Sequence, residues 1–361
     1  MPLTILSVAY PLTPVGPNAV GGSEQILTSL DFAFKEVGYR SIVVACEGSE
    51  TAGELVATPP WDGDLNEEVR RWAQQQHLIA IQQALHKYEI DFIHMHSLDW
   101  HQYTPDPGIP LLATLHLPPD WYPDFIYDWD RPRTYLNCVS KAQCASAPPG
   151  PVPKFVVENG VPTSRLRTRV NKRNYVLALG RVCPEKGLHI ALDAARRANV
   201  PMILSGEVYR YQTHLEYFEQ EIKPRLNARR KFTGPAGLER KRRLMAGAKC
   251  LLVPSVVAET SSLVSMEAFA CGTPVIAFNI GALPEIVEHG RTGFIVQSED
   301  EMVDAIRRID EIDPEECRRV ARERFSAARM ARDYMALYDR IRSREIAIPP
   351  VPEMPVPQPS E

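Results

Sequence analysis

Short apolar runs alternate along this chain with longer stretches in which apolar residues recur at helical spacing. Residues 3–10 form the first apolar run and residues 41–46 the second. Between them, the spacing predicts a helix that Ser23 caps and Gly38 ends. A strand–helix–strand unit of this kind implies a parallel sheet. The predicted buried face of the helix carries Ile26, Leu30, Ala33 and Val37.

The same alternation continues through the rest of the chain. We predict helices over residues 67–88 and 188–198 and a further helix that starts near residue 262. Residues 162–174 are polar, basic and without periodicity, so we place a domain boundary there. Further apolar runs predict strands at residues 92–95, 111–115, 136–140, 175–179, 202–204, 232–234, 250–253 and from 275 onward.

Composition narrows the class of protein. The 361 residues fit two domains, and an apolar content of 44% is usual for a soluble globular protein. A net charge of −4 argues against a general nucleic-acid-binding protein, so we expect no nucleic acid as partner. No apolar run approaches the ~20 residues of a membrane span, and we expect no signal peptide. The seven cysteines are scattered, which favours reduced core thiols and a cytoplasmic location.

Two kinds of segment favour surface roles. The basic runs at residues 229–231 and 240–243 are expected to be solvated helix edges, with peripheral membrane contact as the alternative. Residues 346–361 are rich in proline and are expected to be disordered or polyproline II. A partner protein could bind this tail, but a plain tail is the favoured interpretation.

Candidate chemistry is concentrated in residues 254–275. A predicted buried strand ends here, and Glu259 and Glu267 follow with seven residues between them. Ser261 or Ser262 can cap the next helix, whose first turn offers unpaired N–H groups to a phosphate. One carboxylate can then face a sugar ring while the other faces a ribose. The alternative is that both carboxylates are solvated surface groups.

A second candidate is the loop at residues 180–187, between a predicted strand and a predicted helix. Arg181 and Lys186 lie on this loop. Two cations in front of a helix can neutralise a diphosphate leaving group, which removes the need for a metal ion. A single Arg or Lys on a loop is usually solvated. The presence of Glu259 and Glu267 elsewhere in the chain favours the functional interpretation.

These two stretches resemble the signature of the retaining glycosyltransferases of family four, which have the GT-B fold. The loop at 180–187 resembles the family's Gly-Arg and Lys-Gly motif. The family has an aromatic residue and a glycine where Ser261 and Ser262 stand here, at positions that line the donor-sugar pocket. The sugar is therefore not assigned. The residues of the carboxylate motif that match are Glu259, Glu267, Ala268, Ala270, Cys271, Gly272, Thr273, Pro274 and Val275.

The resemblance implies an α/β fold of the GT-B class, with two Rossmann-like parallel-sheet domains facing a central cleft. Residues 1–165 would form the acceptor-side domain and residues 170–325 the nucleotide-sugar donor domain. A C-terminal helix within residues 326–345 would cross back to the first domain. Residues 346–361 would form the proline-rich tail.

The resemblance also implies roles for single residues. Gly21 and Gly22 would let the backbone approach the donor phosphates, although a plain tight turn is the alternative. His116 follows the predicted strand at 111–115 and would face the reacting sugar. The predicted catalytic residues are His116, Glu259, Arg181 and Lys186. The predicted donor-binding residues, with no metal ligand among them, are Gly21, Gly22, Gly180, Arg181, Lys186, Ser205, Gly206, Gly234, Glu259, Ser261, Ser262, Leu263, Val264 and Glu267.

The implied activity is retaining transfer of a sugar from a nucleoside diphosphate sugar to an acceptor hydroxyl, without metal or cofactor. The acceptor could be a saccharide, a lipid-linked molecule or a small molecule. One alternative is a sugar-nucleotide epimerase or hydrolase of the same fold, which would release isomerised donor or free sugar. Another is a non-catalytic nucleotide-binding module, which would bind the donor without turnover.

Two further patterns have competing interpretations. His94 and His96 share one face of a strand with His101 nearby, but hydrogen-bonded histidines are favoured over a metal site. Residues 121–129 alternate aromatic and acidic side chains, which could stack on sugars. A loop or short helix folded over the domain is the favoured interpretation of this segment.

Overall fold

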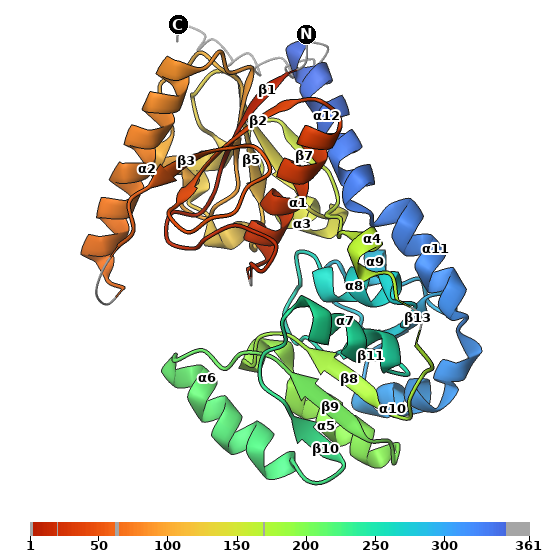
Figure 1. The fold of residues 1–361 in the computed structure, drawn as a ribbon. Coiled ribbons are helices and arrows are strands. Elements are labelled where there is room, and N and C mark those ends of the chain that lie inside the picture. The colour runs from red at the N-terminus through yellow and green to blue at the C-terminus, as the bar shows by residue number, and fades with distance from the viewer. Residues whose placement is uncertain (1–2, 20, 62–64, 169, 344–361) are drawn as a thin grey trace, which may run out of the picture.

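Two parallel sheets divide the chain into two α/β domains. The computed structural model describes residues 3–19, 21–61, 65–168 and 170–343. The first domain runs from red to yellow in Figure 1, and the second continues in green and blue. The predicted fold class of two parallel-sheet α/β domains is confirmed.

The first sheet has seven parallel strands in the order β3-β2-β1-β4-β5-β6-β7. Its order reverses direction at β1, as in doubly wound sheets, where ligands bind beyond the carboxyl ends of the strands. The central strands β1, β4 and β5 consist almost entirely of buried residues, which is why they read as continuous apolar runs. The strands are β1 (Thr4–Val8), β2 (Arg40–Cys46), β3 (Glu54–Thr58), β4 (Phe92–Met95), β5 (Leu111–Leu115), β6 (Thr134–Cys138) and β7 (Lys154–Val156).

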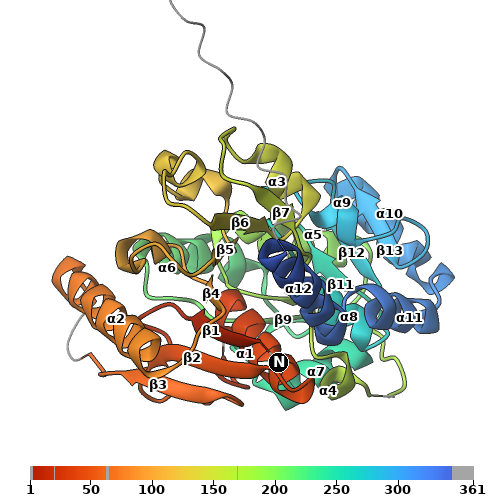
Figure 2. The same cartoon turned by 90° about the horizontal axis from the view of Figure 1, so that it is seen from above.

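Helices cover both faces of this sheet. One face packs against α1 and the C-terminal helix α12, and the other packs against α2 and the short helices that follow β4 and β5. Figures 1 and 2 both show α12 beside α1. The helices of this region are α1 (Gly22–Glu36), α2 (Glu67–Lys87), η1 (Trp100–Tyr103), η2 (Pro119–Trp121), η3 (Asp124–Tyr127), α3 (Lys141–Ser146), α4 (Thr163–Leu166) and α12 (Ala327–Arg342).

The second sheet has six parallel strands in the order β10-β9-β8-β11-β12-β13. The strands are β8 (Val176–Leu179), β9 (Met202–Ser205), β10 (Arg230–Phe232), β11 (Leu251–Val253), β12 (Val275–Phe278) and β13 (Gly293–Val296). The helices are η4 (Pro184–Lys186), α5 (Leu188–Arg197), α6 (Gln212–Tyr217), η5 (Phe218–Ile222), η6 (Lys223–Arg225), α7 (Leu238–Gly247), α8 (Leu263–Ala270), α9 (Leu283–Ile286), α10 (Glu299–Arg308), η7 (Ile309–Glu311) and α11 (Pro314–Arg324).

The chain crosses between the domains twice, and the two crossings lie side by side. The backbone N–H of Val161 donates to Phe325 O at 2.8 Å, and Ala327 N–H donates to Val161 O at 2.9 Å. A side chain at Gly160 would meet Ser326 O at 2.6 Å, so only glycine allows this close approach. The two connections therefore pair with each other at the junction between the domains.

Buried hydroxyl groups fasten α12 into the core of the first domain. Tyr334 Oη lies 3.0 Å from Thr114 Oγ1 and accepts a hydrogen bond from Asn137 Nδ2 at 2.9 Å. Tyr338 Oη lies 2.7 Å from His94 Nδ1. Both tyrosines are fully buried. A helix that follows the second domain in sequence thus completes the core of the first.

Three local expectations were wrong or incomplete. The first helix has Gly21, not Ser23, at its N-cap, and the Ser23 hydroxyl donates to Glu24 Oε2 at 3.0 Å. Val37 lies at the C-cap and is 53% exposed, so it does not join the buried face. Strands β3, β7 and β13, each at the edge of its sheet, were not predicted. Strand β3 has one buried residue and lacks a continuous apolar run.

Two remaining expectations concern the ends and surface of the chain. None of the helices in the described ranges combines the length and the apolar character needed to cross a membrane. The proline-rich segment 346–361 lies outside the described residues.

We predict that replacing His77 with leucine stabilises the first domain most at acidic pH. His77 on α2 is fully buried, neither ring nitrogen has a hydrogen-bond partner among the described residues, and burial lowers its pKa to about 4. Because the unfolded chain then binds more protons between that value and about 6.5, His77 costs stability as pH falls through this window. His77→Leu also removes an unsatisfied buried group worth about 1–3 kcal/mol.

The measurement is thermal unfolding of both proteins at pH 5 and pH 8. The exposed His86 on the same helix supplies the control variant His86→Leu, which should show no such gain. A His77→Leu protein that is no more stable than wild type at pH 5 would contradict the prediction.

Candidate active site

Glu259 and Lys186 form an ion pair, although 73 residues separate them in sequence. Their side chains are 13% and 30% exposed, respectively. The hydroxyl of Ser255 donates to the same Glu259 Oε1 that meets Lys186 Nζ. The structure thus brings together a carboxylate and a cation that the sequence analysis had assigned to one site.

Glycines on two loops hold the backbone around this ion pair. Gly187 has a φ of +58°, and an added Cβ would lie 2.2 Å from Pro254 O. Gly281 has a φ of +55°, and its Cβ would lie 2.5 Å from both N and O of Glu259. Ala282 N–H also donates to Glu259 O at 2.8 Å. Both positions therefore need glycine for conformation and for space.

The start of α8 leaves polar groups unpaired. Ser262 occupies the N-cap, but its hydroxyl pairs with Ser265 Oγ at 2.8 Å and makes no capping bond, contrary to expectation. The backbone N–H groups of Leu263 and Val264 have no acceptor among the described residues. Ser261 Oγ is buried and also lacks a partner. Such a helix start favours an anion.

Glu267 is buried within α8 and is paired with Lys241 of α7. The side chain of Lys241 is only 14% exposed. The basic run at 240–243 is therefore not uniformly solvated: Arg240 and Arg243 are exposed as expected, but Lys241 belongs to the candidate site. Sequence reasoning missed Lys241 because its partner lies on a different helix.

The loop ends of β8, β9 and β10 meet through their backbones. Gly180 N–H donates to Ser205 O at 3.1 Å, and Gly206 N–H donates to Gly234 O at 3.0 Å. The Ser205 hydroxyl donates to Gly234 O at 2.7 Å, so it is already paired. Arg181 follows Gly180, is exposed, and forms no ion pair with a residue that the structure describes.

His116 joins the site from the first domain. The hydroxyl of Thr260 donates to the backbone O of His116 at 2.9 Å, across the junction between the domains. Because Thr260 follows Glu259 directly, this bond brings His116 and Glu259 into one neighbourhood. Burial lowers the pKa of His116 to about 4, so its imidazole is neutral at neutral pH.

Three histidines form a connected row behind the site. His116 Nε2 lies 3.1 Å from His96 Nδ1, and the rings of His96 and His94 are 3.9 Å apart. His94 Nε2 lies 2.8 Å from Thr114 Oγ1. The favoured interpretation of hydrogen-bonded histidines is confirmed. His101 lies apart from this row and contacts the ring of Phe125.

The starts of α1 and α8 face each other across the domain junction. A Cβ added at Gly22 would lie 3.6 Å from Leu263 Cδ1. Glu24 lies beside this contact, and a Cβ at Gly21 would collide with its Oε2. Burial raises the pKa of the Glu24 carboxyl. Sequence reasoning had not placed a carboxyl group beside the two glycines.

The aromatic segment at residues 121–129 folds over the first domain, which agrees with the interpretation favoured from the sequence. Tyr122 and Tyr127 are buried, whereas Trp121 is 59% exposed and Phe125 is 48% exposed. Tyr122 Oη accepts the backbone N–H of His116 at 3.0 Å. The segment therefore supports the backbone of His116 and leaves two aromatic rings at the surface.

The second domain matches a known family. A family model described as glycosyl transferases group 1 matches residues 164–324. The second domain is similar to this family over nearly its full length. The match spans the loop at 180–187 and the carboxylate motif at 254–275, so the resemblance stated from these residues is confirmed.

Curated relatives match part of the chain. The chain is 44% identical over 70 residues to the D-inositol 3-phosphate glycosyltransferase of Streptomyces scabiei, which covers 19% of this chain and 16% of that protein. In eight such relatives, the matched stretches cover 15% to 43% of the relative's own length. This chain therefore spans less than half of the length of these relatives.

Solved structures match the whole GT-B fold. AviGT4, a glycosyltransferase involved in avilamycin A biosynthesis, has a TM-score of 0.71 at 23% identity, covering 95% of this chain and 98% of that one. Anabaena Alr3699/HepE, solved in complex with UDP-glucose, has a TM-score of 0.71 at 19% identity, covering 93% and 99%. These likenesses establish the GT-B fold.

We predict that Gly281→Ala destabilises the second domain more than Gly290→Ala does. Both glycines have left-handed φ values, +55° and +76°, which cost alanine about 1–2 kcal/mol. A Cβ at Gly281 would collide with the backbone of Glu259, whereas no described residue lies within 4 Å of a Cβ at Gly290. The collision with Glu259 should add about 1–3 kcal/mol. Chemical denaturation of both variants measures the difference, and equal losses would refute the close contact.

Proposed function

We propose that this protein is a retaining glycosyltransferase that moves a sugar from a nucleoside diphosphate sugar to an acceptor hydroxyl. The observation that carries the proposal is the hydrogen bond from Thr260 to His116 O, because Thr260 directly follows Glu259, which pairs with Lys186. Residues assigned to the donor side and to the first domain thereby meet at one place. The UDP-glucose complex of a protein with this fold supports a nucleotide sugar as donor.

The diphosphate would bind between the loop at 180–187 and the start of α8. Arg181 has no competing ion pair among described residues, and Lys186 can share its charge between Glu259 and a phosphate oxygen. The free N–H groups of Leu263 and Val264 supply further donors. These cations and donors take the role that a metal ion has in other transferases, so we propose metal-independent catalysis without a cofactor.

The remaining residues fit the other parts of the donor. Glu267 lies inside α8, where its carboxylate would accept hydrogen bonds from the ribose hydroxyls. Ser205, Gly206 and Gly234 would frame the base through their backbones, because the Ser205 hydroxyl is already paired. Glu259 and His116 would face the sugar.

In the proposed reaction, the acceptor hydroxyl attacks the anomeric carbon on the face that the diphosphate leaves. The bond from that carbon to the phosphate oxygen breaks with its electron pair, and the phosphate oxygen takes the acceptor's proton. Positive charge develops on the sugar, and the Glu259 carboxylate would stabilise it. Neutral His116 would hydrogen-bond the sugar or acceptor without adding a repelling charge.

The acceptor would approach from the first domain. The exposed rings of Trp121 and Phe125 are candidates for contact with a saccharide or the sugar part of a lipid-linked acceptor. Peripheral membrane contact through the exposed basic residues stays a proposal. All seven cysteines are free, which supports the proposed cytoplasmic location.

A thermal-shift panel of UDP, GDP, ADP and TDP, each alone and with its common sugars attached, tests the proposed function. A ligand at a hundred times its dissociation constant should add about 2.7 kcal/mol of stability. Stabilisation by one base followed by transfer to an acceptor supports the proposal. Isomerised donor or free sugar as the main product would favour an epimerase or hydrolase, and binding without turnover a non-catalytic module.

Removing the Arg181 side chain should weaken binding of the bare nucleoside diphosphate by about 1.5–3 kcal/mol, as for a lost charged hydrogen bond. Calorimetric titration of Arg181→Ala measures this change. The control is Arg243→Ala, which removes an exposed arginine from α7 and should bind as wild type does. Equal affinities of the two variants for the nucleoside diphosphate would show that Arg181 does not bind the diphosphate.

Replacing Glu259 and replacing Glu267 should affect different steps, catalysis in the first case and nucleotide binding in the second. Glu259→Gln should lower kcat on the order of a hundredfold and leave binding of the bare nucleotide nearly intact, because the charge on the sugar develops only in the transition state. Glu267→Gln should weaken the same nucleotide by roughly 1–3 kcal/mol, because ribose is held equally throughout. Because Glu267→Gln leaves Lys241 without its ionic partner, thermal unfolding checks that this variant still folds.

Calorimetry beside steady-state kinetics decides between the two roles. If Glu259→Gln loses the nucleotide while Glu267→Gln keeps it, the roles are exchanged. If neither change alters binding or rate, the donor site lies elsewhere.

Excess chelator should leave most of the transferase activity, because Arg181 and Lys186 supply the charge that stabilises the leaving diphosphate. The rate is measured before and after chelator treatment, and again after magnesium or manganese is restored. Complete loss with chelator and recovery with either ion would contradict metal-independent catalysis.

A further inference from the structure

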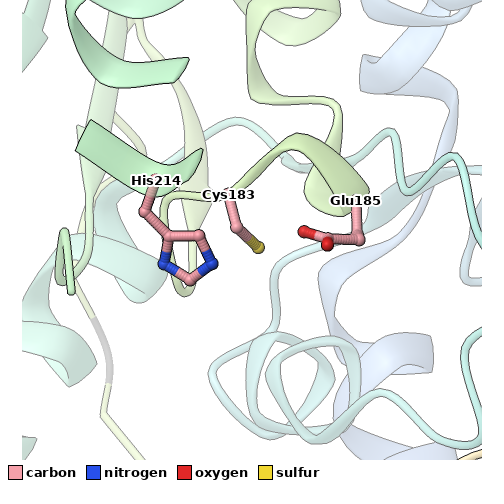
Figure 3. A group of neighbouring side chains, drawn as sticks. All are labelled: Cys183, Glu185 and His214. Atoms are coloured by element: carbon pink, nitrogen blue, oxygen red, sulfur yellow. The ribbon is translucent and has the colours of Figure 1, made fainter. Parts of the chain in front are cut away.

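Three side chains with metal-binding atoms converge beside the loop at 180–187. Cys183 precedes η4, Glu185 lies within it, and His214 comes from α6. One ligand atom from each residue lies within 4.8 Å of the other two. Figure 3 shows the Cys183 sulfur between a ring nitrogen of His214 and the carboxylate of Glu185. We propose that these residues form a binding site for a zinc-type divalent cation, distinct from the residues assigned to sugar transfer.

The combination of ligand types points to zinc. Thiolate sulfur, imidazole nitrogen and carboxylate oxygen are the three donors that Zn²⁺ prefers in proteins. Ligand atoms around one tetrahedral zinc ion stand about 3.3–3.8 Å apart, given bonds of about 2.0–2.3 Å. The present separations, all within 4.8 Å, therefore need to shrink by at most about 1.5 Å. Side-chain rotation of the exposed Glu185 and a small shift of the loop can supply such a movement.

His214 presents a ring nitrogen to the cluster from a buried position. Its side chain is only 7% exposed. In Figure 3, the ring nitrogen nearer the Cys183 sulfur is Nε2, whereas Nδ1, which is buried without a hydrogen-bond partner in the described part of the chain, lies on the far side of the ring. Nε2 is therefore the nitrogen that a cation at this cluster would engage.

The local charges are compatible with a bound cation. Burial raises the pKa of the Cys183 thiol to about 11, and the thiol donates a hydrogen bond to the backbone O of Arg181 at 3.7 Å. Binding of a metal ion by this sulfur would displace the thiol proton. A thiolate and a carboxylate together carry two negative charges, which balance one divalent cation. Arg181 and Lys186 act against a second cation nearby, so we expect one ion per chain.

A bound ion would clamp the loop at 180–187 onto α6. Glu185 O already accepts the backbone N–H of Val256 at 2.9 Å, which links this loop to the segment that carries Glu259. Three protein ligands would leave a fourth position for water. The ion would therefore stabilise the fold of the donor loop, and it takes no part in the proposed transfer step.

Cobalt binding tests the site without relying on activity. Metal-free full-length protein is titrated with Co²⁺, and the cobalt–thiolate absorption band reports a cysteine ligand. We expect one Co²⁺ per chain with this band, and a higher Tm when Zn²⁺ is added. Cys183→Ser should lose both effects. The control Cys144→Ser removes a half-buried cysteine outside the cluster and should keep both.

His214→Gln provides a second variant that keeps the thiol. It should weaken Co²⁺ binding at least tenfold, even where Cys183→Ser folds poorly. A wild-type protein that shows no cobalt–thiolate band overturns the proposal. A band that survives in both Cys183→Ser and His214→Gln also overturns it. Neither result depends on whether the protein transfers sugars.

Discussion

The backbone at Glu259 is held in place by two glycines in left-handed conformations, and the rest of the candidate donor site depends on this contact. Gly187 brings the cation-bearing loop against Pro254, and Gly281 lies against Glu259 itself. Lys186 then reaches the Glu259 carboxylate from the first of these loops. A carboxylate and a lysine that attract each other are thus fixed at the carboxyl ends of β8, β11 and β12 before any ligand arrives. Such preorganisation is what stabilisation of a charged transition state requires.

The same end of the second domain is tied to the first domain by polar contacts. Thr260 reaches His116 O, and the Glu285 carboxylate accepts the backbone N–H of Lys141 at 3.0 Å at the start of α3. Tyr338 of α12 contacts His94. His94 packs against His96, and His96 in turn contacts His116. The helix that crosses back from the second domain therefore also supports the row of histidines that ends at His116.

Sequence patterns predicted the sheets well because buried parallel strands are continuous apolar runs. β4 and β5 have the predicted bounds, whereas the half-exposed edge strand β3 gave no such signal. The motif at 254–275 placed both carboxylates, but not their partners. Lys241 belongs to a basic run on another helix, and only the packing of α7 on α8 brings it to Glu267. The cluster of Cys183 and His214 was missed for the same reason, since no short spacing of ligands marks it in the sequence.

Retention of configuration separates the proposed reaction from direct displacement, and the first-formed product reveals it. With the donor selected by the nucleotide panel, ¹H NMR can follow the anomeric proton of the transferred sugar, or of the sugar released slowly to water before it mutarotates. An arrangement that lets the acceptor attack on the face the diphosphate leaves predicts that the first product has the donor's own anomeric configuration. A first product of the opposite configuration would contradict it.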